Sequence, residues 1–184
     1  ALEIQRQIMD ESLKSIEPGK TTREEAGWSA ADRLLEHGIG PGYHAATLFL
    51  PYMPSAQTRN DSNSEVFERG SFIAWDMGVA YLNFATDIKR HGYILEEGET
   101  DIPAGLKLAW ESGKQIRSIL KGTVVVGRTA GETHATMVAT LEAAGFVSTP
   151  SDDRSSQYRD LMSKLGDSDK IGFTIDFHTT GNTS

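Results

Sequence analysis

The stretch that decides the fold is Trp75-Asp76-Met77-Gly78-Val79, followed by Thr86-Asp87-Ile88-Lys89-Arg90. Residues 72–79 are apolar around an acid, which predicts a strand, and 80–95 are apolar with polar interruptions, which predicts two more strands. The aspartates are eleven positions apart. Two adjacent strands joined by a tight turn near 78–82 can bring carboxylates at this odd offset to one spot. We therefore expect a hairpin that carries two neighbouring carboxylates.

Two carboxylates held together disfavour each other's ionisation unless a cation lies between them. Hard oxygen ligands suit divalent manganese, cobalt or zinc, so the pair Asp76 and Asp87 is a candidate metal site. The residues alone leave an alternative open, in which Asp76 caps a turn and Asp87 is a solvated strand residue. The chain contains 26 acidic residues, so many acidic pairs have this spacing.

The segments around this hairpin predict helices. Residues 2–16 have helical periodicity and precede Pro18-Gly19, which ends a helix. Thr21 and Glu24 have the spacing of a capping box, which predicts a second helix that ends at Gly38. Residues 45–50 form a short apolar strand and 51–68 a polar loop in this interpretation. Downstream, Asp101 as a cap and Pro103 in the first turn predict a long helix, through Leu106, Trp110, Ile116 and Leu120.

A short pattern recurs and predicts two related halves. Gly19-Lys20-Thr21-x-x-Glu24, with a helix closed by Gly38, is echoed by Gly127-Arg128-Thr129-x-x-Glu132, with a helix closed by Gly145. Capping chemistry alone can also produce such a match. The expected organisation is one partial catalytic domain over 1–184, with a first half of about 1–100 and an incomplete second half of about 101–184.

Composition excludes several classes of protein. A net charge of -8, with 18 basic residues and no basic cluster, argues against a nucleic-acid partner. No apolar run is long enough for a membrane span, so we expect a soluble protein, cytoplasmic or exported. The absence of cysteine excludes disulfides, thiolate metal ligands and a cysteine nucleophile.

The Asp-x-Gly strand at Asp76 and the Asp-Ile-x-Arg segment at Asp87 resemble the metal-binding hairpin of the creatinase, prolidase and methionine aminopeptidase family, peptidase family M24. The resemblance extends over nearly the whole chain. It implies a third metal ligand at His178, in Phe177-His178-Thr179-Thr180-Gly181. By contrast, His37-Gly38-Ile39-Gly40 precedes the aspartates and is explained as a helix end. The remaining histidines, His44, His91 and His134, are expected to have structural or surface roles.

The sequence departs from the family pattern in two ways. The family's substrate-holding histidine upstream of the first aspartate is absent, and Arg59 or Asn60 lies near its position. The family's two glutamates, a ligand and a metal bridge, come downstream of the His segment, whereas this chain ends at Ser184. We therefore expect a truncated domain with the metal ligands Asp76, Asp87 and His178, no catalytic residue within the chain, and little activity on its own.

The resemblance implies the pita-bread fold, an α+β arrangement of two related halves, here with the second half incomplete. It implies a metallopeptidase of the aminopeptidase or Xaa-Pro dipeptidase type, in which two divalent ions (Mn, Co or Zn) activate a water that attacks short peptides. Unpaired strand edges would favour a homo-oligomer or a complementing second fragment.

Two other functions remain open. One is an inactive creatinase-like domain that binds a protein partner, and the other is metal-independent hydrolysis of the creatinase type. The missing upstream histidine favours the first, whereas retention of Asp76, Asp87 and His178 argues against it.

Overall fold

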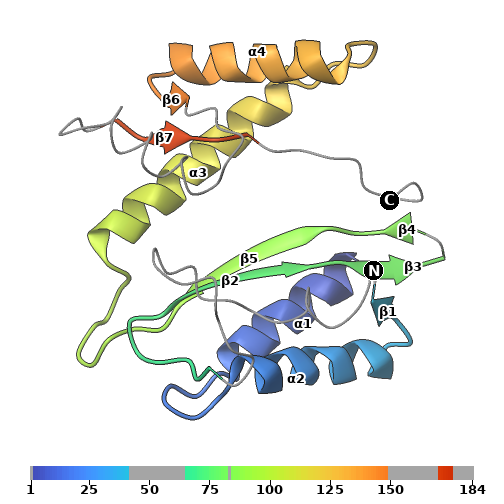
Figure 1. Ribbon diagram of the computed structural model, residues 1–184, viewed down its shortest axis with the longest axis vertical. Coiled ribbons are helices and arrows are strands. Elements are labelled where there is room, and N and C mark those ends of the chain that lie inside the picture. Colours follow the sequence, from blue (N-terminus) through green and yellow to red (C-terminus); the bar gives the residue numbers. More distant parts are fainter. Residues whose placement is uncertain (1, 42–64, 83, 149–169, 176–184) are drawn as a thin grey trace. The chain divides into compact units, whose positions relative to one another are not determined.

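The computed structural model describes residues 2–41, 65–82, 84–148 and 170–175 (Figure 1). The chain divides into two compact units, one up to Ile102 and one from Pro103, each with its own helices and strands. The mixed helix and strand content agrees with the predicted α+β class. None of the described helices has the length and apolarity needed to cross a membrane.

The first unit packs two helices against a long β-hairpin (Figure 1). β2 and β5 pair antiparallel, whereas β1, β3 and β4 form a separate small sheet in that order. The bounds of these elements are α1 (Leu2–Lys14), α2 (Arg23–Glu36), β1 (Gly40–Pro41), β2 (Phe72–Met77), β3 (Val79–Tyr81), β4 (Phe84–Ala85) and β5 (Ile88–Tyr93).

The core of this unit lies between the helices and one face of β2. Trp75, Met77 and Val79 are almost completely buried and cluster with Ile8 and Leu34 of the two helices. Because side chains alternate along a strand, Asp76 lies on the other face of β2. Hydrophobic burial thus fixes which face of the hairpin carries the aspartate.

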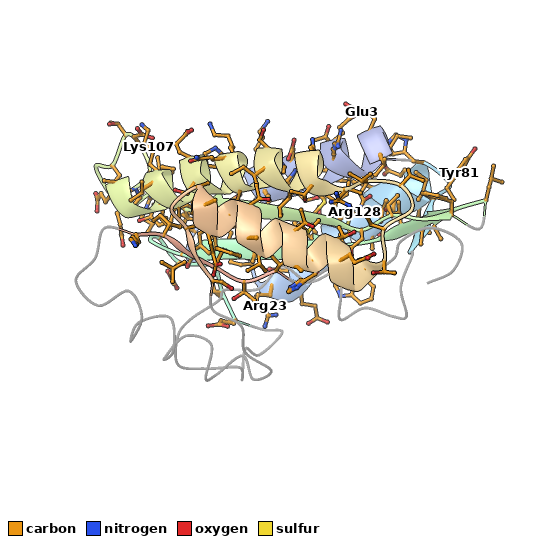
Figure 2. All side chains as sticks on the ribbon, turned by 90° about the horizontal axis from the view of Figure 1, so that it is seen from above. Glu3, Arg23, Tyr81, Lys107 and Arg128 are labelled. Atoms are coloured by element: carbon orange, nitrogen blue, oxygen red, sulfur yellow. The ribbon has the colours of Figure 1, made fainter. Side chains whose placement is uncertain are left out.

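The predicted strand over 72–79 is in fact interrupted at Gly78, between β2 and β3. The tight turn near 78–82 was placed too early, because Tyr81 pairs with Phe84 and the chain therefore reverses between these two residues. Leu82 begins this reversal with a φ of +49°, and Tyr81 points away from the ribbon at the tip of the hairpin (Figure 2).

The cap of α2 differs from the prediction by one residue. The hydroxyl of Thr22, not Thr21, accepts the backbone N–H of Glu25, and the Glu25 carboxylate accepts the N–H of Thr22. The hydroxyl of Thr21 instead accepts the N–H of Glu17 in the preceding turn. The predicted end of α2 is confirmed: His37 is the C-cap and Gly38 follows with a φ of +65°.

The second unit also begins with two packed helices. The predicted long helix is α3. Its N-cap residue is Pro103, so the prediction that Asp101 caps it is wrong. The Asp101 carboxylate instead accepts the N–H of Ile102. The predicted capping box of Thr129 and Glu132 at α4 is confirmed. The bounds are α3 (Ala104–Thr123), α4 (Ala130–Ala143), β6 (Val147–Ser148) and β7 (Gly172–Phe173), the two strands being parallel.

The predicted strand over 45–50 and most of the predicted polar loop over 51–68 lie outside the described residues. The described end of that loop is attached to the start of α2. Val66 forms an isolated antiparallel bridge with Thr22, and Phe67 is completely buried.

Candidate metal centre

The register of the hairpin places the first aspartate opposite a lysine. Asp76 of β2 pairs directly with Lys89 of β5. The same register holds on both sides of the strand break, since Met77 pairs with Ile88 and Ala80 with Ala85. Gly78 is therefore opposite Asp87, and the register places Asp76, Asp87 and Lys89 on one face of the hairpin.

This face is more open than the face that packs on the helices. The side chain of Asp76 is 29% exposed and that of Lys89 59% exposed. Further along the same face, Phe72 stacks on His91 with 5.4 Å between ring centroids. His91 thus has a packing role, in agreement with the structural role expected for it.

The two oxygens of Asp76 have different surroundings. Oδ2 lies 3.2 Å from the Lys89 Nζ. Oδ1 is buried and has no hydrogen-bond partner among the residues that the structure describes. A buried carboxylate oxygen that no protein group satisfies is costly, and such atoms often lie where an ion or water binds.

The pKa of Asp76 reflects this environment. Burial raises the pKa above its ordinary value, the ammonium of Lys89 lowers it, and the neighbouring carboxyl of Asp87 raises it. The two aspartates are therefore close enough to influence each other's ionisation. The hairpin brings together the two acids that the sequence singled out.

The Asp-Ile-x-Arg segment contributes to both faces of the hairpin. Ile88 packs on the hydrophobic core, and Arg90 Nε lies 3.5 Å from Asp10 Oδ1 of α1. Alternation along β5 then directs Lys89 to the opposite face, and Asp87 with it. The apolar and arginine positions of the motif attach the strand to the helix, while the aspartate position faces the candidate centre.

A buried polar network, which the sequence analysis missed, supports the strand break beside the aspartates. Gln5 of α1 is completely buried and donates from Nε2 to the Met77 carbonyl at 2.5 Å. Thr86 donates its hydroxyl to Gln5 Oε1 at 2.6 Å and accepts the N–H of Val79 at 3.0 Å. The available clue was a polar residue at helical spacing from Ile8 on the apolar stripe of α1.

The third predicted ligand, His178, lies outside the described residues, as do His44, Arg59 and Asn60. Within the part of the chain that the structure describes, no group of three or more His, Asp or Glu side chains is arranged to hold a metal ion. Asp76 and Asp87 fit a divalent ion as part of a donor set: they are hard oxygen ligands on one face, one with an unsatisfied buried oxygen.

Comparisons with known proteins agree with this geometry. Residues 1–178 match the family model described as metallopeptidase family M24. No curated protein matches the sequence significantly.

Several solved structures share the fold. An X-Pro aminopeptidase from Thermotoga maritima is 19% identical with a TM-score of 0.58, over 79% of this chain and 40% of that chain. A prolidase from Pyrococcus horikoshii is 18% identical (TM-score 0.50; 78% and 40%), and a variant of Escherichia coli aminopeptidase P is 16% identical (TM-score 0.50; 88% and 35%). The chain thus spans about 40% or less of the length of these relatives.

Proposed function

The chain belongs to metallopeptidase family M24, and we propose that it contributes two metal ligands, Asp76 and Asp87, to a metal-dependent Xaa-Pro aminopeptidase or dipeptidase. Its architecture is that of the pita-bread fold. The observation that carries the proposal is the acidic pair on one face of the hairpin. Asp76 there has a buried oxygen that no described residue satisfies and a pKa that Asp87 helps to raise. His178 is the third proposed ligand.

The proposed substrates are short peptides, since solved structures that share the fold are named X-Pro aminopeptidase and prolidase. Divalent metal ions, when bound, acidify a water and polarise the scissile carbonyl. The role of Asp76 and Asp87 is to hold the ions on a rigid scaffold, since β2 and β5 pair without interruption from Phe72 to Met77. Gln5 and Thr86 keep the adjacent strand break in one conformation.

The test combines metal binding with peptide cleavage. In a longer product that contains the downstream glutamates, we expect Asp87→Ala to abolish Mn-dependent Xaa-Pro cleavage. In this chain we expect it to weaken Mn²⁺ binding at least tenfold, which corresponds to about 1.4 kcal/mol. Folding should be nearly unchanged, because removing one of two neighbouring acids relieves repulsion. Cleavage is measured on this chain and on the longer product of its coding sequence, if the latter continues downstream.

Asp32→Ala is the matched control, because Asp32 is an exposed acid on α2 with the same charge. It should bind Mn²⁺ like the unaltered chain. Unchanged cleavage by Asp87→Ala would remove Asp87 from the site. Absence of both metal and cleavage in every form would favour the protein-binding alternative, and cleavage that resists a chelator would favour the metal-independent hydrolase. A homo-oligomer or a complementing fragment stays a prediction, to be measured by sedimentation.

A further inference from the structure

Lys89 places a positive charge inside the candidate metal centre. Its Nζ lies 3.2 Å from Asp76 Oδ2. The backbone register sets this contact, since Lys89 is directly opposite Asp76 in the β2–β5 pairing. Directly opposite residues on two paired strands have Cβ atoms only about 4.5–5.5 Å apart, so the Lys89 ammonium is within reach of the Asp76 carboxylate.

The second aspartate lies on the same face of the hairpin as Lys89. Asp87 precedes Lys89 by two residues. Because side chains alternate along a strand, the two side chains lie on the same face. The centre therefore contains two carboxylates and one tethered cation. A lysine is suited to this position, because its ammonium is a compact charge on a flexible stem that can move away.

The two partners of the ion pair differ in exposure. Asp76 is 29% exposed, whereas Lys89 is 59% exposed. The carboxylate is fixed on the hairpin, and the ammonium reaches it from the solvent side. The remaining Asp76 oxygen, Oδ1, is buried and has no partner in the described part of the chain, where the lysine satisfies only Oδ2.

We propose that Lys89 is an exchangeable cation of the metal centre: it neutralises Asp76 and Asp87 in the metal-free protein and must leave Asp76 when a divalent ion binds. The inference rests on the proposed function, because it takes Asp76 and Asp87 as metal ligands. A divalent ion that binds both oxygens of Asp76 takes the position of the ammonium beside Oδ2, and the two cations repel each other. Lys89 thereby lowers the affinity of the centre for a divalent ion. In the metal-free protein its charge offsets the repulsion between the two carboxylates.

The experiment is a Mn²⁺ titration at constant ionic strength, in which free Mn²⁺ is followed by electron paramagnetic resonance. Lys89→Met keeps the length of the side chain and removes its charge. We expect this variant to bind Mn²⁺ with a dissociation constant about three- to tenfold lower, since a competing partly exposed ion pair is removed. In the metal-free state its Tm should fall by about 2 °C, because the acidic pair loses its counter-charge.

The matched control is Lys114→Met. Lys114 forms an ion pair with Glu111 at 2.6 Å on α3, and its side chain is 53% exposed. The control changes the net charge by the same amount, so any general attraction of cations to a more acidic protein appears in both variants. Affinity must rise in Lys89→Met and stay unchanged in Lys114→Met to support the exchange.

The outcomes separate the inference from the proposed function. Equal Mn²⁺ affinities for the unaltered chain and Lys89→Met would overturn the exchange while leaving the metal site intact. Binding that appears only in Lys89→Met would support the exchange strongly. No binding by either form, with Asp76→Asn and Asp87→Ala equally inert, would overturn the metal site and the exchange together.

Discussion

For Asp76 the sequence allows two interpretations, a metal ligand or a residue that caps a turn. A turn cap or a solvated strand residue would have its oxygens satisfied by backbone or water. Asp76 instead lies within β2, with one oxygen 3.2 Å from Lys89 and the other buried and without a partner within the described ranges. The structure thus excludes the turn-cap role for Asp76 and brings Asp87 near enough to affect its pKa.

The raised pKa of Asp76 predicts a pH dependence of stability in the metal-free protein. An acid whose folded pKa exceeds its ordinary value of 3.8 contributes stability below that value, and the contribution is lost as pH rises through the folded pKa. Asp76→Asn does not titrate, so its stability relative to the unaltered chain should increase from pH 4 to pH 7. Thermal unfolding at several pH values in a chelator measures this, and parallel curves for the two proteins would contradict it.

At the scale of elements, the ends of α2 and α4 were predictable, whereas the start of α3 and the strand break were not. A capping box and a closing glycine are local patterns, so both ends of α2 and α4 could be placed to within a residue. The one-residue error at Thr21 arose because two threonines are adjacent and the preceding turn takes the hydroxyl of the first. The break at Gly78 depends on how β3 pairs with β1, a contact between distant segments that no local pattern contains.

The network of Gln5 and Thr86 connects α1 to this break, and a double-mutant cycle can test its role. Gln5→Leu should destabilise the protein by about 1–3 kcal/mol, because the Met77 carbonyl loses its donor and the Thr86 hydroxyl its acceptor. Combining it with Thr86→Val should cost less than the sum of the single changes. Gln7→Leu is the control, since Gln7 is exposed on the same helix and its amide donates to Glu11 at the surface.

Denaturant unfolding measures these free energies, and Mn²⁺ binding measures the effect on the centre. We expect weaker binding by Gln5→Leu and unchanged binding by Gln7→Leu. Additive costs for Gln5→Leu and Thr86→Val would show that the two side chains act separately.

At the scale of the whole molecule, the two units repeat one local arrangement. The N-caps Thr22 and Thr129 differ by 107 in residue number, as do the closing glycines Gly38 and Gly145. After each glycine, the next N–H bonds back to a buried leucine carbonyl, Leu34 in the first unit and Leu141 in the second. This is the Schellman arrangement, with its usual apolar contact. That the two units are the two predicted related halves stays a prediction.

The equivalent leucines give a test of this correspondence. Leu34→Ala and Leu141→Ala should each destabilise their own unit by about 2–5 kcal/mol, because each leaves a cavity in a core cluster. Leu35→Ala is the control, since Leu35 is 68% exposed and surface changes cost less than about 0.5 kcal/mol. Native-state hydrogen exchange measures the loss residue by residue. Equal costs at Leu34 and Leu35 would contradict the arrangement.

The sequence by itself determined the helices and the capping box of α4, because both depend on local patterns. Whether Asp76 and Asp87 share a face of the hairpin depends also on the register, since a slip of one residue would turn one strand's side chains to the other face. Tertiary structure decided which residues face these aspartates. The position of the chain reversal sets the register, so only pairing could place Lys89 opposite Asp76. Only the docking of α1 could bury Gln5 against the strand break, because burial of a polar side chain requires partners from another element.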